Sequence, residues 1–240
     1  MIYTIAATVA LISYFLGSIN TSVILSKSIY GDDVRDYGSG NAGATNMLRV
    51  HGAGIAVLTL ICDVLKGALA VLITFWLQCL FPLKAYPMSD FEYNYLVGNL
   101  HYIAGLFVVL GHDFPIWFGF RGGKGVAASL GVIISINWKI GLIVLFLALL
   151  IMIFSRYVSL GSIIAAVVYP FILITYIIAG GEKLNITYLI MALMLALILI
   201  LKHHANISRL RNGTENKLFS KKDKLSENNI ENEDMEDNIE

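Results

Sequence analysis

Long runs of apolar residues, separated by short polar segments, make up most of the first 201 positions. Residues 1–26 carry no charged side chain and lack the cationic start and cleavage site of a signal peptide, which predicts a retained spanning helix. Six further runs extend from about residue 54 to 81, 95 to 110, 126 to 137, 140 to 154, 158 to 179 and 186 to 201. The pattern predicts an all-α integral membrane protein with seven transmembrane helices.

The fourth and fifth runs are separated only by a short break around Lys139, so residues 126–154 could also form one long helix. If they form two, the fourth run spans about 18 Å at ~1.5 Å per residue. The hydrocarbon core of a bilayer is about 30 Å thick. We therefore expect short or partly inserted central helices.

The distribution of Lys and Arg residues distinguishes seven spans from six. With seven spans, ten of these residues fall on one side and three on the other, whereas six spans divide them six against seven. Positive residues favour the cytoplasmic side, so we expect the N-terminus outside and the C-terminus in the cytoplasm. The ten are Lys27, Arg35, Arg49, Arg121, Lys124, Arg156, Lys202, Arg209, Arg211 and Lys217, and the three are Lys84, Lys139 and Lys183.

The composition of the 240 residues supports this class, because 57% are hydrophobic and 14% are charged. Soluble domains are about one-quarter charged, so a soluble enzyme, a secreted disulfide scaffold and a disordered protein are excluded. The net charge of zero averages a membrane domain (1–212), with 13 basic and 8 acidic residues, and a tail (213–240), with 4 Lys and 9 acids. We expect this tail to be an acidic, disordered cytoplasmic segment with no role beyond solvation. Cys62 and Cys79 lie in one apolar run, so neither a disulfide framework nor a metal site is expected.

Candidate chemistry gathers in polar segments on the predicted cytoplasmic side. The first is GSGNAGATNMLR (38–49), which contains the pattern G-x-G-x-x-G. No strand precedes it and no βαβ unit is possible, which excludes a dinucleotide-binding fold. Its glycines allow successive backbone N–H groups to converge on an anion, beside hydroxyl and amide donors. A tight turn between two helices is the purely structural alternative.

The second segment, FRGGKG (120–125), runs directly into an apolar helix, and a helix N-terminus beside Lys124 suits a phosphate. The Walker pattern is absent, so nucleotide hydrolysis is not indicated. After the fifth run comes a shorter polar cluster, RYVSLGS (156–162). After the last run, His203 and Asn206 are three positions apart and would share a face of a continuing helix. Alternatively, His203 is only a partner of the helix dipole.

Four other residues carry ionisable side chains to which no role in the chemistry is assigned. Asp63 and Lys66 lie in the second run, where an isolated charge is costly, so we expect them to pair with each other. His51 and His101 have no local partner and are assigned no function.

Three segments together resemble the bacterial acyl-phosphate:glycerol-3-phosphate acyltransferases (PlsY). They are GSGNAGATNMLR (38–49), GHDFPIWFGFRGGKGVA (111–127) and HHANISRLRNGTE (203–215). The resemblance implies transfer of a fatty acyl group from acyl phosphate to the 1-hydroxyl of sn-glycerol 3-phosphate. The products would be lysophosphatidic acid and inorganic phosphate, the first acylation step of phospholipid synthesis.

The resemblance also implies a set of site residues. Arg49 and Lys124 would hold phosphate groups, Ser39 and Asn206 would orient them, and His203 would orient or polarise the attacking hydroxyl. Either His203 or the substrate's own phosphate would accept the proton. The catalytic set is Ser39, Lys124 and His203, and the substrate-binding set is Arg49, Asn206, Gly40, Asn41, Thr45, Asn46, Gly122, Gly123 and Ser162.

The setting that follows is the bacterial plasma membrane, with the site on the cytoplasmic side and no cofactor, metal or nucleic acid. We expect membrane lipid around the protein and, as a partner, the enzyme that produces acyl phosphate. The residues agree in outline, because two phosphate-bearing substrates need two anion sites and the acyl chain needs an apolar groove. A transporter of phosphorylated metabolites is the alternative, although such proteins place polar residues near the midplane, often in repeated halves. A metal-dependent head-group transferase would need an array of Asp residues that the polar segments lack.

Overall fold

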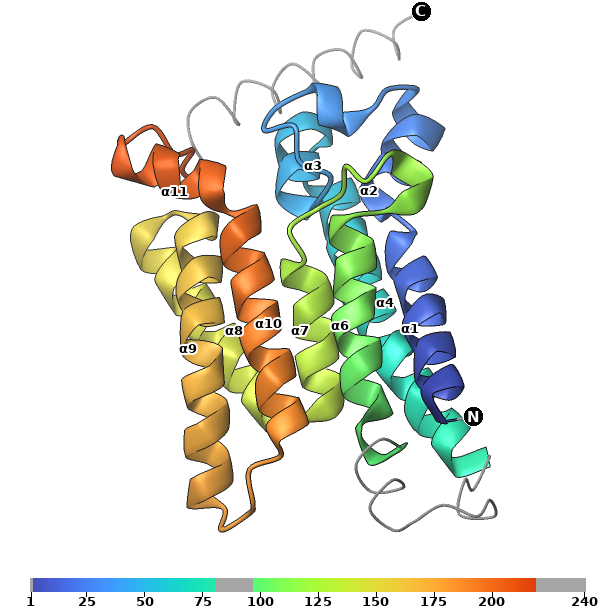
Figure 1. Cartoon of the computed structure of the whole chain (residues 1–240). Helices are drawn as coiled ribbons and strands as arrows, with labels where there is room; N and C mark the ends of the chain where they lie inside the picture. The colour runs from blue at the N-terminus through green and yellow to red at the C-terminus, as the bar shows by residue number, and fades with distance from the viewer. Residues whose placement is uncertain (1, 81–96, 219–240) are drawn as a thin grey trace, which may run out of the picture.

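The computed structural model describes residues 2–80 and 97–218, and every regular element in these two ranges is helical (Figure 1). The longer helices are α1 (Ile2–Ser18), α4 (Ala53–Leu80), α6 (Leu100–Asp113), α7 (Val126–Ile136), α8 (Trp138–Ser155), α9 (Val158–Ala179) and α10 (Ile186–Lys202). The shorter elements are α2 (Thr21–Leu25), a π-helical turn (Ser26–Tyr30), α3 (Ala44–His51), α11 (His204–Arg211) and 3-10 turns at Val34–Asp36, Val97–Asn99 and Ile116–Phe118.

Five helical segments of the described ranges are long and apolar enough to cross a membrane, and the bent pair α10–α11 would make a sixth. Helix α7 has only 11 residues, so it covers about 16 Å at ~1.5 Å per residue. The apolar runs therefore become helices as expected, and the expected short central helix is confirmed. Residues 126–154 form two helices because Asn137 leaves the helical conformation and accepts a hydrogen bond from the N–H of Ile140 at 3.2 Å.

The first apolar run is not one regular helix over residues 1–26, as the pattern alone suggested. Helix α1 ends at Ser18, and the side chain of Asn20 starts α2 by accepting a hydrogen bond from the N–H of Val23 at 3.2 Å. An Asn side chain that satisfies a free backbone N–H favours a new helix start over continuation. The segment from Tyr3 to Tyr30 is still long and apolar enough to cross a membrane.

Glycines set the closest helix contacts in the bundle. A Cβ added to Gly17 of α1 would lie 2.0 Å from the carbonyl oxygen of Val108 in α6. A Cβ on Gly131 of α7 would lie equally close, at 2.0 Å, to the carbonyl oxygen of Val64 in α4. Small residues let helix backbones approach closely where lipid supplies no hydrophobic driving force. These contacts hold α1 on α6 and α7 on α4.

The core of the bundle is built from α4, α6, α7, α8, α9 and α10. Tyr169, Leu173 and Val132 are fully or almost fully buried within it. In contrast, Phe154 is 82% exposed and Ile153 is 72% exposed on α8. Large apolar side chains that face outward in this way suit a lipid environment.

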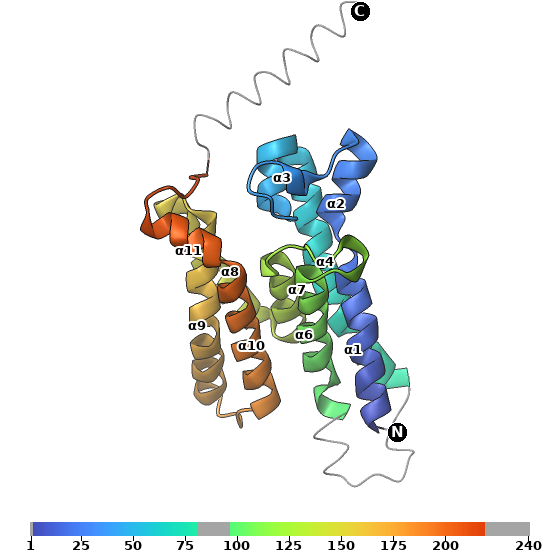
Figure 2. The ribbon, with the colours of Figure 1, turned by 45° about the horizontal axis from the view of Figure 1, so that its top comes forward.

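The three polar segments meet at one end of the bundle, opposite the start of α1 (Figure 1). Helices α3 and α11 stand on either side of this end, and the start of α7 lies between and below them (Figure 2). The tertiary fold thus brings together segments that are more than 150 positions apart in the chain.

Candidate functional site

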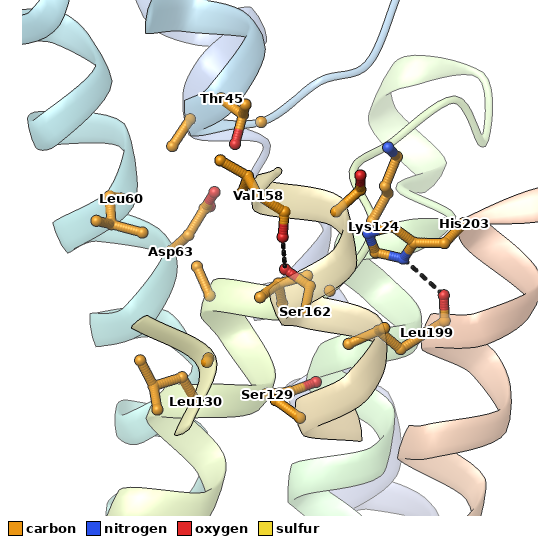
Figure 3. A pocket seen from close by; sticks show the side chains of 18 of the residues that line it. Thr45, Leu60, Asp63, Lys124, Ser129, Leu130, Val158, Ser162, Leu199 and His203 are labelled. Carbon is orange, nitrogen blue, oxygen red and sulfur yellow. Dashed lines mark hydrogen bonds between the residues drawn. The ribbon is translucent and has the colours of Figure 1, made fainter. Parts of the chain in front are cut away.

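A cavity of about 660 Å³ opens at the end of the bundle where the three polar segments meet. Its mouth is polar, whereas its deeper walls consist mainly of apolar side chains of α4, α7, α8, α9 and α10, as the labelled Leu60 and Leu130 illustrate (Figure 3). Val144, Ala165, Tyr169 and Leu195 are among these deeper residues. The cavity can therefore take a ligand with a charged head and an apolar tail.

The first glycine-rich segment folds around the buried side chain of Asn46. Its Oδ1 accepts hydrogen bonds from the N–H of Ser39 at 2.8 Å and from the Ser39 hydroxyl at 3.0 Å. Its Nδ2 donates to the carbonyls of Val34 at 2.8 Å and Tyr37 at 3.1 Å. Gly38 has a φ of +60°, and a Cβ there would lie 2.4 Å from Asn46 Oδ1. Asn46 thus lines the cavity while its amide is occupied in shaping the loop.

The second glycine-rich segment packs on the end of α6. The N–H of Gly123 donates to the carbonyl of His112 at 3.1 Å. A Cβ on Gly122 would lie 2.1 Å from that carbonyl oxygen, and one on Gly123 would lie 2.0 Å from His112 Nε2. These two positions need glycine for close packing, and the next residue, Lys124, extends into the cavity wall.

Arg35 ties the two segments together. Its guanidinium donates to the carbonyls of Phe118 at 2.7 Å and Arg121 at 3.1 Å, and it pairs with Asp33 at 2.7 Å. The Arg35 guanidinium holds the pKa of the Asp33 carboxyl well below its usual range, and Lys27 adds to this effect. Arg35 and its ion pair with Asp33 therefore hold the chain just before the first segment against the second segment.

A chain of hydrogen bonds joins the second segment to the third. Lys124 Nζ donates to Asn206 Oδ1 at 2.5 Å, and Asn206 Nδ2 donates to Glu215 at 2.6 Å. Glu215 also accepts from the Ser159 hydroxyl at 2.9 Å and from Arg209 Nε at 2.7 Å. Because Glu215 can only accept, it sets the Asn206 amide so that its oxygen faces Lys124.

The electrostatics of this chain favour an anion at its open end. Burial lowers the pKa of the Lys124 ammonium to about 8, and the positive charges of Arg209, Arg49 and Lys202 add to the effect while Glu215 opposes it. Burial would raise the pKa of Glu215, but hydrogen bonds from Asn206, Arg209 and Ser159 outweigh it and lower the pKa. A phosphate beside Lys124 would compensate the repulsion among these cations.

His203 lies at the bend between α10 and α11, which meet at 58°. The expectation of one continuing helix through His203 and Asn206 is therefore wrong, since α10 ends at Lys202. The bend nevertheless brings both side chains to the cavity wall. His203 Nδ1 lies 2.8 Å from the carbonyl oxygen of Leu199 (Figure 3). A carbonyl only accepts, so Nδ1 carries the proton, and in the neutral ring Nε2 is an acceptor.

The predicted pairing of Asp63 with Lys66 is confirmed, with Lys66 Nζ 2.7 Å from Asp63 Oδ1. Sequence reasoning missed that Asp63 and His112 also line the cavity. His51 has distant partners, because it lies 3.2 Å from Asp32 and stacks on the ring of Tyr30 at 4.0 Å. Asp32 is 19 positions away along the chain, so no local pattern could show this contact.

The structure brings most of the predicted site residues to one cavity. Lining it are Ser39, Asn41, Thr45, Asn46, Arg49, Lys124, Ser162, His203 and Asn206, whereas Gly40, Gly122 and Gly123 are not among the lining residues. The Ser162 hydroxyl donates to the carbonyl of Val158 at 3.0 Å (Figure 3).

Glu215 is the clearest residue that sequence reasoning missed. It was assigned to the tail over 213–240, yet it is buried against Asn206 and Ser159. Its position inside the third motif, HHANISRLRNGTE, was the available signal. The predicted disorder of the tail concerns mainly residues 219–240, which lie outside the described residues.

Comparison with known proteins gives a consistent result. The sequence model of the family described as "Glycerol-3-phosphate acyltransferase" matches residues 7–213. Proteins of that name from Shouchella clausii and Clostridioides difficile are 40% and 41% identical. The match with the first relative covers 92% of this chain and 99% of that protein. The match with the second covers 90% of this chain and 96% of that protein.

Two solved structures are also similar to this chain. One is the crystal structure of PlsY (YgiH), an integral membrane glycerol 3-phosphate acyltransferase, in its glycerol 3-phosphate form. It is 33% identical with a TM-score of 0.72, and the match covers 89% of this chain and 95% of that one. The lysophosphatidic acid form of PlsY is 32% identical with a TM-score of 0.69, with 88% and 94% covered.

Proposed function

This chain belongs to the glycerol-3-phosphate acyltransferase family, and we propose that its acyl donor is acyl phosphate. In the proposed reaction, the 1-hydroxyl oxygen of sn-glycerol 3-phosphate forms an ester bond with the acyl carbon. The bond between that carbon and the phosphate oxygen breaks, and the phosphate group of the glycerol 3-phosphate takes up the hydroxyl proton. Lysophosphatidic acid and inorganic phosphate are the products.

The observation that carries the proposal is a single cavity with a cationic mouth and an apolar interior. Arg49 and Lys124 line the mouth, and Val144, Tyr169 and Leu195 lie deeper. An acyl phosphate combines the same two characters in one molecule, so its head and its chain can be bound together. Neither a nucleotide nor an acyl carrier is needed to explain this shape.

The residues can be given roles in the transfer. Arg49 and Lys124 would hold the two phosphates, because charge-assisted hydrogen bonds to phosphate are the strong ones. Ser39 would support the loop that carries Arg49, and Asn206 would keep Lys124 in place, as their hydrogen bonds suggest. Acyl phosphate has a good leaving group, so positioning and charge stabilisation can account for much of the rate.

His203 would accept a hydrogen bond from the attacking hydroxyl. Its Nδ1 is engaged with the Leu199 carbonyl, which leaves Nε2 as the acceptor of the neutral ring. In this role His203 orients the 1-hydroxyl, and the substrate's own phosphate then takes up the proton. A His203→Gln enzyme that is inactive at every pH, yet binds glycerol 3-phosphate normally, would contradict this assignment.

We further propose seven spans, with α7 completing its crossing through its flanks and with the cavity facing the cytoplasm of a bacterial cell. The ten cations predicted on one side motivate the orientation. Single cysteines at Ser208 and Glu182, with Cys62 and Cys79 replaced, would test it in intact cells. We expect an impermeant reagent to label position 182 only, and labelling at position 208 alone would reverse the orientation.

The donor is tested by offering acyl phosphate, acyl-coenzyme A and acyl-acyl carrier protein separately to the purified protein with glycerol 3-phosphate. We expect lysophosphatidic acid from acyl phosphate alone, with one equivalent of phosphate released. Turnover with either thioester at a similar rate would refute the proposed donor while leaving the family assignment intact.

A further inference from the structure

Three ionisable side chains lie buried between α4 and α6 beneath the cavity mouth. Asp63 is 2% exposed, Lys66 5% and His112 3%. Lys66 Nζ lies 2.7 Å from Asp63 Oδ1, and His112 Nδ1 lies 3.6 Å from the same oxygen. We call these residues the Asp63 cluster. None of the three has a role in the transfer proposed above.

The Asp63 cluster contacts the backbone on two sides, at the end of α1 and at the second glycine-rich segment. Lys66 Nζ also donates to the carbonyl of Ile19 at 3.0 Å, at the break between α1 and α2. On the other side, the carbonyl of His112 accepts from the N–H of Gly123 at 3.1 Å, and the imidazole packs on Gly123. Gly123 immediately precedes Lys124, so the cluster supports the backbone that carries this lysine.

Two supports therefore locate Lys124. Asn206 holds the end of its side chain, and His112 holds the backbone beside it, with Asp63 facing the imidazole from behind. We propose that Asp63, Lys66 and His112 are positioning residues for acyl transfer, which fix the Lys124 loop. This inference rests on the proposed function for its rate measurement.

A cluster that served only to hold the helices together would not need charges. Buried ion pairs can often be replaced by apolar side chains of similar volume without loss of stability, whereas removal of one partner leaves a buried charge uncompensated. Stability and positioning can thus be separated by replacing the Asp63–Lys66 pair as a unit.

The test is the double variant Asp63→Leu with Lys66→Met. We expect a thermal midpoint equal to or above that of the wild type and a kcat with acyl phosphate and glycerol 3-phosphate at least tenfold lower. Thr59→Val is the matched control, because Thr59 is fully buried one turn earlier in α4 and its hydroxyl donates to the Ile55 carbonyl at 2.8 Å. We expect the control to keep the wild-type kcat.

A second measurement reports the place of Lys124 directly. The affinity for inorganic phosphate should fall above the pKa of Lys124, about 8, which burial and the charges of Arg209, Glu215, Arg49 and Lys202 determine. The Asp63–Lys66 pair has no net charge, so its replacement should not itself move this value. If the loop shifts, Lys124 becomes better hydrated, and the fall moves to higher pH by about one unit.

The outcomes are distinct. A folded double variant with wild-type kcat and an unchanged phosphate profile would show that the cluster is only structural. If the double variant does not fold, Asp63→Asn with Lys66→Gln, which removes both charges together and keeps polar side chains, must show the same tenfold fall and the same pH shift. A wild-type protein without acyl transfer would refute the proposed function, while the phosphate profile would still decide the positioning role.

Discussion

The two glycine-rich segments look alike in the sequence but use their glycines for different physical reasons. In the first, Gly38 and Gly40 have φ values of +60° and +70°, so the chain turns through a conformation that other residues rarely adopt. In the second, Gly125 also has a positive φ, but Gly122 and Gly123 leave room for the end of α6. One segment is shaped by its own backbone around Asn46, whereas the other is shaped by a neighbouring helix. A glycine-rich motif therefore indicates where a site lies but not how it is built.

Removal of the cation of the second segment should have the strongest effect on activity. Lys124→Ala should leave the protein folded but lower kcat/KM by about two orders of magnitude or more. A charge-assisted hydrogen bond contributes about 1.5–3 kcal/mol, even before any added stabilisation of the transition state. Lys139→Ala is the matched control, because Lys139 lies over the ring of Trp138 at the other end of the bundle. Nearly wild-type turnover by the Lys124 variant would remove it from the catalytic set.

A paired substitution tests the two uses of glycine. In Gly123→Ala the new Cβ would meet His112 Nε2 at 2.0 Å, so the loop must move and kcat/KM should fall at least about tenfold. In Gly40→Ala the nearest atom would be 3.4 Å away, and only the positive φ opposes alanine. We expect a stability loss of about 1–2 kcal/mol there with activity within about threefold. Turnover rates and thermal midpoints are measured for the two variants. Equal losses of activity would contradict the view that the two segments use their glycines for different reasons.

Arg49→Lys examines the cation at the end of the first segment. A planar guanidinium can donate two parallel hydrogen bonds to a phosphate, whereas an ammonium binds it at one point. We therefore expect about a tenfold loss in kcat/KM. The measurement is steady-state kinetics with each substrate varied in turn. Full activity of the variant would mean that two-point recognition does not operate at Arg49.

The smallest effect concerns pH. Lys124, with a pKa lowered to about 8, is charged below that value and loses its proton above it, so glycerol 3-phosphate should bind progressively more weakly above pH 8. Arg49 stays charged throughout this range. Binding measured between pH 7 and 9.5 should show the fall in the wild type and no fall in Lys124→Arg. A fall that persists in the arginine variant would have to come from another group.

Hydropathy predicted the helices well because lipid exposure demands apolar side chains over the whole length of each span. The observed starts of α7, α9 and α10 at Val126, Val158 and Ile186 coincide with the expected ones. The interruption at Asn20 was not expected, because a capping side chain changes the backbone without changing the apolar pattern.

The sequence was sufficient to predict which residues form the site but not which of them contact one another. Arg49, Lys124 and His203 were identified from motifs, and all three line one cavity. The parts that sequence reasoning missed are contacts between distant elements, such as Glu215 with Ser159 and Asp63 with His112. No local spacing encodes such pairs, because they depend on how whole helices pack.

The shortness of α7 has an electrical consequence. Helices α7 and α8 share the turn at Asn137 and have 11 and 18 residues, respectively. At ~1.5 Å per residue, α7 therefore stops about 10 Å short of the level that α8 reaches. If α8 spans the bilayer as proposed, a phosphate at Lys124 would lie inside part of the transmembrane field, which acts on each elementary charge with about 2.3 kcal/mol per 100 mV for a full crossing. In an energised cell, substrate affinity should therefore depend on the membrane voltage, an influence that detergent micelles remove.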